Sequence, residues 1–340
     1  MKILTYDWHQ QKGAAFEDFS GCEIPSHYGS YEQEYWAIRK SVGVRDVSYF
    51  GKIQMSGKDR QRFLNGMISN DVKTLQTGKG VWALFLDVKG HIQSDMKIYA
   101  FPEHFLMVLQ HYVRDKIMSG LDRYIISEDV RMKDVTEESA LFQVLGPQSE
   151  SFLRSKGAAR LPEDVYSFST NRLDGIDVQI IRLSAGYTVL CPSTAAAAVL
   201  EVLDAQLVGM RAFDVFRVEA GLPLVQRDTE EMSFPQEARM EAALNFQNGC
   251  YLGQEVMARI DAQGHVNKRL IGIASGESLN SGDKMYKGEK EIGKVMSTTF
   301  SLLLKQPFAL GYVRREVAKD GETVEVGDHR TTAIVKELPL

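Results

Sequence analysis

Residues 248–260 read NGCYLGQEVMARI, and this segment carries the strongest pattern in the chain. Gly249 and Gly253 bracket Cys250, and glycines in such positions allow sharp turns or the close approach of another backbone. From Gln254 onward, apolar side chains again recur at helical spacing. The segment therefore predicts a glycine-bracketed turn that presents a cysteine and leads into a helix. Cys250 is then either a functional thiol or a small buried apolar residue.

A second segment, residues 216–225, reads FRVEAGLPLV and marks the end of a helix. Gly221 and Pro223 stop the helical pattern, and Arg217 and Glu219 lie just before that stop. A carboxylate near a helix C-terminus opposes the helix dipole, so Glu219 gains no stability from the helix itself. We therefore expect Glu219 to have a specific partner, unless it is a solvated acid of the last turn.

Residues 81–88 and 91–100 predict a β-hairpin with its turn at residues 89–90. Successive side chains of the return strand point to opposite faces. Asp95 is either a working carboxylate or one half of an ion pair with Lys97 across an exposed strand face. One predicted face carries Ile92, Ser94, Met96 and Ile98, and the other carries Gln93, Asp95, Lys97 and Tyr99.

The composition is that of a globular protein. The 340 residues suffice for two or three domains at roughly 150 residues each. Hydrophobic residues make up 44% and charged residues 25%, which excludes a disordered or fibrous chain. The net charge of −5 lacks the basic excess that is typical of nucleic-acid binders, so we expect no direct nucleic-acid partner.

The spacing of the cysteines and the composition of the first ten residues indicate in which compartment we expect the protein. Cys22, Cys191 and Cys250 are too scattered for a disulfide framework, which favours a reducing, cytoplasmic location. Residues 1–10 lack the apolar core of a secretion signal, and no run of 18 apolar residues predicts a membrane span. Because GxxxxGK[ST], GxSxG, HExxH and CxxC motifs are absent, no metal site is predicted, and any link to iron–sulfur clusters would be indirect.

The order of expected elements indicates the architecture. Strand-like and helix-like pieces alternate through most of the chain, which favours an α+β fold over a long parallel sheet. From about Lys268 onward, short apolar pieces are separated by turns rich in Gly, Ser and Asp, and helical periodicity is nearly absent. This texture predicts a small C-terminal β-barrel or sandwich, with a boundary near residues 262–268.

The cysteine segment also carries a family resemblance. GCYLGQEVMAR, together with residues 264–270, resembles the signature of the YgfZ family. These are folate-binding proteins related to the aminomethyltransferase (T-protein) of the glycine cleavage system. Further blocks follow in the family's order and cover nearly the whole chain: residues 46–48, 70–72, 90–99, 216–223, 234–237, 292–295 and 309–312.

The resemblance implies an α+β, three-lobed clover-leaf fold with a central channel for reduced folate. One lobe, residues 51–134, would be inserted into the other, which comprises residues 1–50 and 135–265. Residues 1–265 would thus form the T-protein-like region, and residues 266–340 the C-terminal β-barrel.

The resemblance also implies a tetrahydrofolate site. Glu219 would grip the pterin ring, since a carboxylate can accept two parallel N–H bonds. Asp95 would work beside a folate nitrogen, although the related enzymes carry two adjacent acids where this chain has Ser94 and Asp95. The family block begins Lys-Gly-Cys-Tyr, so Asn248 replaces a charged donor and should hold its contact more weakly. The other residues implied are Arg217, Tyr251, Gln254, Glu255 and Arg259 for cofactor binding, and Cys250 as the reactive or partner-contacting thiol.

Three functions follow as hypotheses, and whether the protein is an enzyme stays open among them. The first is a tetrahydrofolate-binding accessory protein that supports the maturation or repair of iron–sulfur enzymes, and thereby tRNA modification, with those enzymes as partners of Cys250. The alternative is a folate-dependent aminomethyltransferase or demethylase, in which Asp95 positions an amine and tetrahydrofolate takes up the one-carbon unit. The third is a binding module that kept the fold and lost the folate, which only Asn248 supports.

Overall fold

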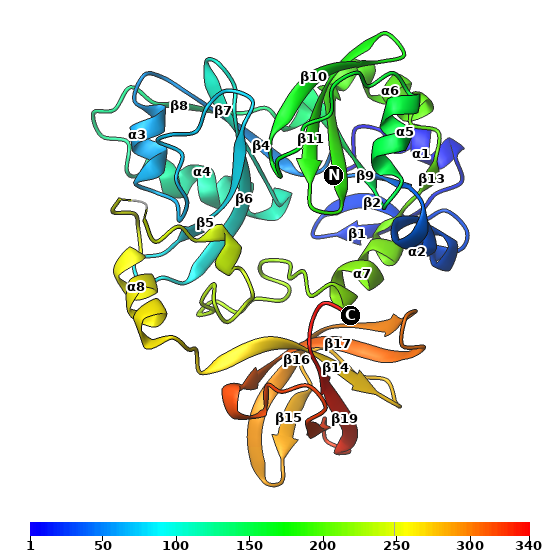
Figure 1. The fold of residues 1–340 in the computed structure, drawn as a ribbon, viewed down its shortest axis with the longest axis vertical. Helices are drawn as coiled ribbons and strands as arrows, with labels where there is room; N and C mark the ends of the chain where they lie inside the picture. Colours follow the sequence, from blue (N-terminus) through cyan, green and yellow to red (C-terminus); the bar gives the residue numbers. More distant parts are fainter. Residues whose placement is uncertain (248) are drawn as a thin grey trace. The chain divides into compact units, whose positions relative to one another are not determined.

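The computed structural model describes residues 1–247 and 249–340 (Figure 1). The described chain divides into two compact units. Unit 1 comprises Met1–Ala83 and Ser94–Phe213, and unit 2 comprises Leu84–Gln93 and Asp214–Leu340. Among the described residues, no helix is both long enough and apolar enough to cross a membrane.

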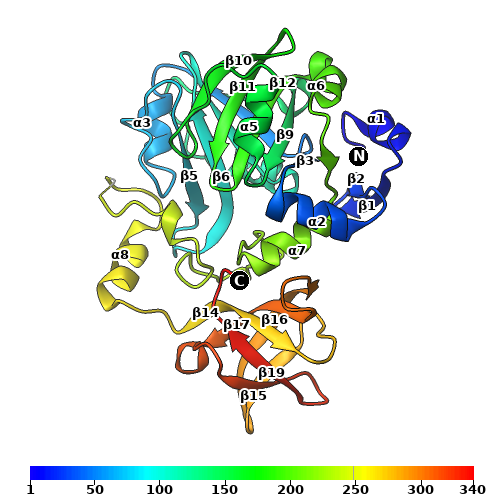
Figure 2. The same cartoon turned by 45° about the vertical axis from the view of Figure 1, so that its right-hand side comes forward.

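A six-stranded sheet forms the larger half of unit 1. Helices α5 (Ser149–Ser155) and α6 (Ala196–Val202) lie against one face of it (Figure 2). Leu153 and Val199 of these helices pack with Phe142 of the sheet in one apolar core. In spatial order the strands are β10 (Phe168–Leu173), β11 (Ile176–Leu183), β12 (Gly186–Pro192), β9 (Ser139–Leu145), β3 (Gly43–Asp46) and β13 (Gln206–Leu207).

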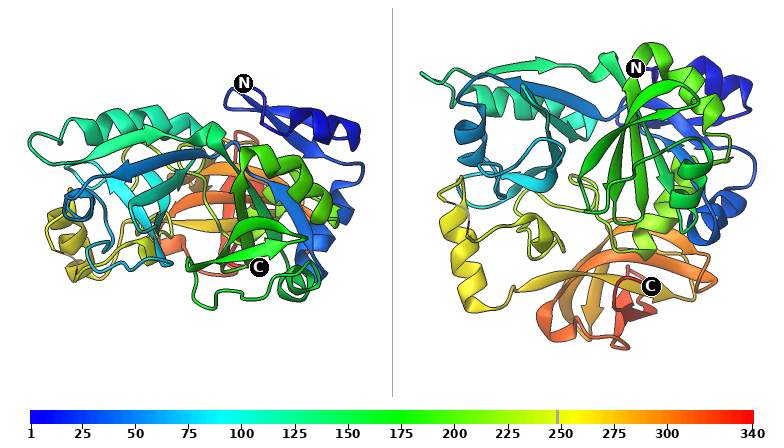
Figure 3. Two further views of the ribbon diagram at one scale, coloured as in Figure 1. Left: turned by 90° about the horizontal axis from the view of Figure 1, so that it is seen from above. Right: turned by 45° about the horizontal axis from the view of Figure 1, so that its top comes forward.

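The predicted hairpin belongs to a five-stranded sheet. Helix α4 (Arg114–Asp122) runs along β4, and a Cβ at Gly51 would lie 3.0 Å from Cβ of Arg114, so this face of the sheet is closed by the helix (Figure 3). The predicted hairpin is confirmed, with Ser94 on the buried side. In spatial order the strands are β5 (Gly80–Leu86), β6 (Ile92–Ala100), β7 (His104–Leu109), β4 (Gly51–Ser56) and β8 (Arg131–Asp134).

The opposite face of this sheet carries Asp95 and is called the Asp95 face below. Cross-strand partners of an antiparallel pair lie on the same side of a sheet, so the register defines its members. Lys97 lies opposite Val108, which lies opposite Lys52. One step further along, Tyr99 lies opposite Leu106, which lies opposite Gln54.

A buried polar network ties the N-terminal helix to the six-stranded sheet. Asp46 of β3 accepts hydrogen bonds from Thr5 and from the Ser48 amide, and pairs with Nε2 of His9 at 2.9 Å. Burial alone would raise the pKa of Asp46, but these bonds and the His9 charge lower it. Unit 1 also contains the α-helices and strands α1 (Tyr6–Gln11), β1 (Ala15–Phe19), β2 (Cys22–His27), α2 (Tyr31–Lys40) and α3 (Arg60–Asn65).

Unit 2 ends in a closed six-stranded barrel, drawn in orange and red in Figure 1. Its interior is apolar and includes Ile273, Val295 and Val313. The predicted α+β class and C-terminal barrel are confirmed. Around the barrel the strands are β14 (Lys268–Ser275), β17 (Gln306–Arg314), β16 (Lys290–Ser301), β15 (Lys284–Lys287), β18 (Thr323–Val326) and β19 (Thr331–Lys336).

Two helices precede the barrel. Helix α7 (Met210–Glu219) ends as expected before Gly221, whose φ of +68° favours glycine. Helix α8 (Gln254–Gln263) begins at the residue where the spacing predicts it. The predicted division into lobes at residues 51–134 and 266–340 stays a prediction.

Candidate functional site

The Glu219 carboxylate is buried at the end of α7 and has barrel partners. Its Oε1 accepts a hydrogen bond from the Ser301 hydroxyl at 2.7 Å and from the Leu303 amide at 3.3 Å. Its backbone carbonyl accepts from the Leu340 amide. The expectation that this carboxylate needs a specific partner is confirmed, because the barrel supplies donors that the helix end cannot.

Arg217 is buried two residues before the end of α7, and its guanidinium partners among the described residues belong to unit 2. Its guanidinium donates to the carboxylates of Asp214 and Asp228. It also donates to the Leu222 carbonyl and, at 2.7 Å, to the Ser297 hydroxyl of the barrel. We infer a structural role for Arg217, which holds the chain reversal after α7 against β16, and its expected contact with a cofactor stays a prediction.

The tip of the β5–β6 hairpin is a rigid turn within unit 2. Asp87 accepts hydrogen bonds from the amides of Lys89 and His91, and pairs with Nδ1 of His91 at 3.0 Å. The Ile92 amide donates to the Ser233 carbonyl. The tip is therefore held both by its own carboxylate and by the 230s segment.

The cysteine segment packs on this tip through two glycines. Gly253 has a φ of +83°, and a Cβ there would lie 2.6 Å from the Asp87 carbonyl oxygen. A Cβ at Gly90 would lie 2.6 Å from Cε of Met257 in α8. A side chain at Gly253 would meet backbone, so the predicted close backbone approach is confirmed at this glycine, whereas Gly249 lies in open space. At Gly90 the close atom ends a flexible side chain, and the φ of +81° is what favours glycine. Asn248, at the start of the segment, lies outside the described residues.

Cys250 and Tyr251 are neighbours with opposite environments. Cys250 is exposed, whereas Cys22 and Cys191 are buried, and burial raises the pKa of their thiols to about 11 and about 12. Tyr251 is only 6% exposed, and its hydroxyl has no hydrogen-bond partner among the described residues. Burial raises the pKa of Tyr251 to about 12, so the hydroxyl stays protonated.

The other predicted residues of this segment lie on α8. Gln254 begins the helix and is half-buried, while Glu255 and Arg259 are exposed one turn apart. Within the described part of the chain, Glu255 and Arg259 form no ion pair with each other. Both charges therefore face solvent in this structure.

Asp95 belongs to unit 1, whereas the other predicted site residues belong to unit 2. Its Oδ2 accepts from Nζ of Lys97 at 2.8 Å and from Nε1 of Trp82 at 3.1 Å. The ion pair with Lys97, one of the two expected readings, is thus present, and it orients the carboxylate. Ser94 lies on the other face, and its hydroxyl donates to the Asp95 carbonyl.

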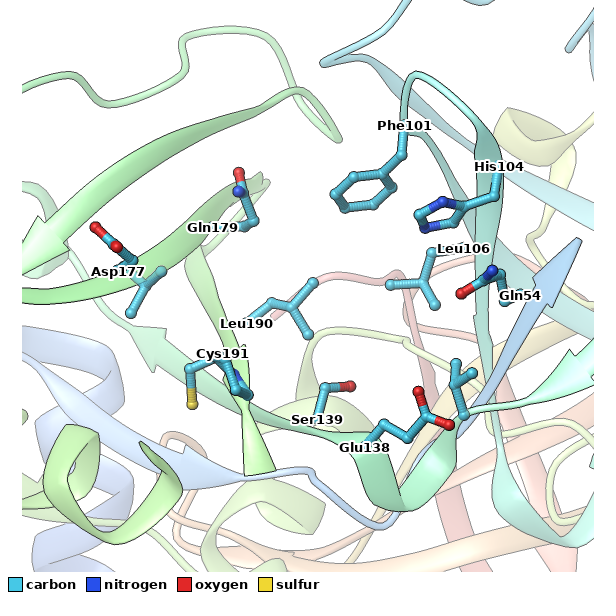
Figure 4. A pocket seen from close by; sticks show the side chains of 13 residues that line it. Gln54, Phe101, His104, Leu106, Glu138, Ser139, Asp177, Gln179, Leu190 and Cys191 are labelled. Carbon is cyan, nitrogen blue, oxygen red and sulfur yellow. The ribbon is translucent and has the colours of Figure 1, made fainter. Parts of the chain in front are cut away.

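A cavity of about 380 Å³ in unit 1 was not expected from the sequence. Leu106 of β7 and Leu190 of β12 face each other across it, and Phe101 lies beside the ring of His104 at its rim (Figure 4). Because Leu106 belongs to the Asp95 face, the cavity lies on that side of the five-stranded sheet. Its wall residues are dispersed along the chain, so no local pattern could have indicated it.

A half-buried charge cluster in unit 2 was also missed. Lys268 lies 3.0 Å from Glu230 and 3.9 Å from Glu237. Burial raises the pKa of Glu237 despite the nearby Lys268 charge. The adjacent Gln236 buries both polar atoms of its amide without a partner among the described residues. Among all the described residues, no group of three His, Cys, Asp or Glu side chains is arranged to hold a metal ion.

Two family descriptions match this chain. The family described as GCVT N-terminal domain matches residues 5–248, and the glycine cleavage T-protein C-terminal barrel domain matches residues 268–340. The chain belongs to the glycine cleavage T-protein family. The second match begins at the residue where β14 of the closed barrel begins.

Similar T-protein family members come from several bacteria. The chain is 30% identical to the aminomethyltransferase of Thermotoga neapolitana over 336 residues, covering 94% of this chain and 92% of that protein. It is 28% identical to the aminomethyltransferase of Desulfitobacterium hafniense with the same coverage. The crystal structure of aminomethyltransferase T from Bartonella henselae superposes with a TM-score of 0.88 at 22% identity, covering 100% of this chain and 97% of that one. The last comparison shows the shared T-protein fold.

We predict that Arg217→Met lowers the free energy of unfolding by about 3 kcal/mol or more, because removing one partner of a buried ion pair leaves a buried charge unpaired. Asp228, which is fully buried, is the residue left behind. Urea denaturation measures the change. The matched control is Arg172→Met, whose exposed ion pair with Asp177 should contribute nothing measurable. Equal stability of the two variants would contradict the structural role of Arg217.

We predict that one thiol of the folded protein reacts rapidly with a disulfide reagent at pH 8. Cys250 is exposed, while the pKa values of about 11 and about 12 keep the buried Cys22 and Cys191 thiols protonated at that pH. Cys250→Ser should abolish the rapid phase, and all three wild-type thiols should react in denaturant. Rapid labelling of folded Cys250→Ser would overturn this assignment.

Proposed function

We propose that this T-protein family member binds tetrahydrofolate and acts as an accessory protein in the maturation or repair of iron–sulfur enzymes, and thereby in tRNA modification, with Cys250 as its functional thiol. The proposal places the chain in the YgfZ branch of the family. The GCYLGQEVMAR block supports that placement. Membership of a family whose named relatives are aminomethyltransferases supports the folate.

The observation that carries the folate proposal is a set of buried polar atoms without partners in unit 2. They include both amide atoms of Gln236 and the hydroxyls of Tyr251 and Tyr312, among the described residues. Each buried polar atom without a partner costs about 1–3 kcal/mol, so a ligand that pairs with it gains that energy back. The pterin ring carries N–H donors beside a carbonyl acceptor, and this donor set suits an amide and a hydroxyl. A reduced folate would supply partners for the unpaired atoms of Gln236 and Tyr251.

We assign distinct roles to the residues of this chain. The Glu219 carboxylate would accept N–H bonds from the pterin edge, and Ser301 would hold that carboxylate in place. Tyr251 and Gln236 would pair with the remaining polar atoms of the ring. A bound tetrahydrofolate would supply nitrogen atoms that can carry a one-carbon unit.

Cys250 supports the accessory role because it is exposed at a fixed position. The turn that carries it is anchored by Gly253 against the hairpin tip, and Tyr251 is buried beside it. A thiol presented on an anchored turn suits contact with a partner protein better than structural packing does. Iron–sulfur enzymes are the partners that we propose.

A second function, aminomethyl transfer or demethylation with tetrahydrofolate as acceptor, is favoured by one observation. The named relatives at 28–30% identity over 94% of this chain are aminomethyltransferases. In that case Asp95 would position the amine of the donor, because its oriented carboxylate attracts a protonated nitrogen. The protein would then be an enzyme of the aminomethyltransferase type.

We predict saturable one-site binding of tetrahydrofolate in anaerobic calorimetry. Glu219→Gln should weaken it about 10- to 100-fold, because a hydrogen bond to a charged group contributes about 1.5–3 kcal/mol. The control is Glu316→Gln, which removes an exposed carboxylate of unit 2 and should leave the affinity unchanged. No binding by the wild-type protein, and no competition by a folate analogue, would overturn the folate proposal.

We predict that cells carrying Cys250→Ser lose the activity of the client iron–sulfur enzymes. Cells carrying a folded Cys191→Ser variant, which changes a buried thiol, should keep that activity. Enzyme assays in extracts of matched expression level measure this. Full client activity with Cys250→Ser would contradict the accessory role. Methylene- or methyl-tetrahydrofolate formed by the purified protein from a panel of glycine-derived and methylated donors would favour the transferase instead.

A further inference from the structure

The cavity of about 380 Å³ in unit 1 is lined by residues of both sheets and lies far from Asp95 along the strands. Leu106, in its wall, pairs with Tyr99, which is four residues beyond Asp95 in β6. At about 3.3 Å per residue, Leu106 is therefore roughly 13 Å from Asp95 along the sheet. Small-molecule sites usually have volumes of about 300–1,000 Å³, so this cavity is large enough for a ligand of its own.

The middle of the cavity is apolar and its rim is aromatic. Leu106 of β7 faces Leu190 of β12 across the space (Figure 4). Leu190 pairs with Gln179, and both lie on the face of the six-stranded sheet that is not packed against α5 and α6. At the rim the rings of Phe101 and His104 are stacked, with centroids 4.8 Å apart and 4° between their planes. Because stacked rings attract a further flat ring, this lining favours an aromatic ligand.

Three polar side chains of the wall are available to a ligand. Gln54, His104 and Ser139 are half-buried, and their side chains form no hydrogen bond within the part of the chain that the structure describes. Burial and the nearby charge of Arg60 lower the pKa of His104, so its ring is neutral at neutral pH and offers one donor and one acceptor. The amide of Gln54 also offers both. A ligand whose edge carries N–H groups and an acceptor would pair with these side chains.

Both charged groups of the wall are acidic. Glu138 and Asp177 line the cavity, and the lining residues that the structure describes include no lysine or arginine. The ion-pair partners of these carboxylates, Lys133 and Arg172, lie outside the wall. An anion in the cavity would meet two carboxylates and no lining cation, so the wall selects against negative charge. The carboxylates of a folate tail are unfavourable here for the same reason.

We propose that this cavity is a second ligand site, which binds an uncharged, flat heteroaromatic molecule with N–H and C=O groups at its edge. The ring would lie against Leu106 and Leu190, and Gln54 and Ser139 would pair with the polar edge. The inference is independent of the proposed function, because none of the residues assigned to tetrahydrofolate lines this cavity.

The test uses two probes that differ in charge, nicotinamide and nicotinate, each titrated by calorimetry at neutral pH. They share one aromatic ring, but only nicotinate carries a carboxylate. We expect saturable binding of nicotinamide and binding of nicotinate that is weaker by about tenfold or more, because the anion meets the acidic wall. Binding of neither probe overturns the inference, and so does equal binding of both.

The test variant is Gln54→Leu, which keeps the size of the side chain and breaks no hydrogen bond of the described chain. It should weaken nicotinamide binding about tenfold, the effect of one lost hydrogen bond, without lowering the thermal midpoint of the ligand-free protein. Ser139→Ala is a second, smaller change that should also weaken binding. The control is Gln10→Leu, which changes an exposed glutamine of α1 and should leave the affinity unchanged. Wild-type affinity in both test variants overturns the inference, as does a lower midpoint in both together with weaker binding, which marks structural residues.

Tetrahydrofolate, titrated in parallel, separates this inference from the proposed function. If Gln54→Leu weakens nicotinamide binding and binds tetrahydrofolate like the wild type, the cavity is a separate site and both proposals stand. If Gln54→Leu weakens both ligands, the cavity is part of the folate site and the inference is overturned. If the wild type binds nicotinamide but no tetrahydrofolate, and Gln54→Leu weakens the nicotinamide binding, the inference stands and the folate proposal fails.

Discussion

The geometry of unit 2 depends on the ion pairs and hydrogen bonds of the buried Arg217 guanidinium. Its hydrogen bonds reach two carboxylates, a backbone carbonyl of the loop after α7, and the Ser297 hydroxyl of the barrel. A buried ion is tolerated only when such partners replace water, so the helix end, the loop and β16 must meet at one point. That meeting point brings Glu219, two residues further on, within reach of Ser301. Glu219, the residue predicted to bind the pterin ring, therefore owes its position to the buried ion pairs of Arg217.

The cysteine segment depends on a different constraint, which is steric. Gly253 leaves no space for a Cβ where the turn before α8 meets the backbone of the hairpin tip. Electrostatics then hold the other side of that tip, through Asp87 and His91. The thiol of Cys250 is exposed, while residues that follow it are committed to contacts, with Tyr251 buried and Gly253 against backbone. Backbone fit at Gly253 thus helps to position an exposed side chain.

Sequence patterns predicted those parts of this site that residues close together in the chain determine. The end of α7, the two faces of β6 and the role of Gly253 all follow from chain spacing, and the structure confirms them. The same patterns could not separate Arg217 as a structural ion from a cofactor ligand, because its partners Asp228 and Ser297 come from other segments. Gln110 carries no local signal at all. Its buried carbonyl without a partner among the described residues is a feature that only the folded chain reveals.

The unpaired atoms lie in both units, and their distribution has a physical consequence. Gln110 belongs to unit 1, whereas Gln236 and Tyr251 belong to unit 2. Each lowers the stability of the ligand-free chain, and apolar replacements of similar size are available at every one of them. A chain that keeps such atoms keeps them at the expense of its own stability, which is the expected trade-off where polar groups read a ligand. A ligand that pairs with such atoms would therefore stabilise the unit that carries them, beyond any contact that the protein makes with itself.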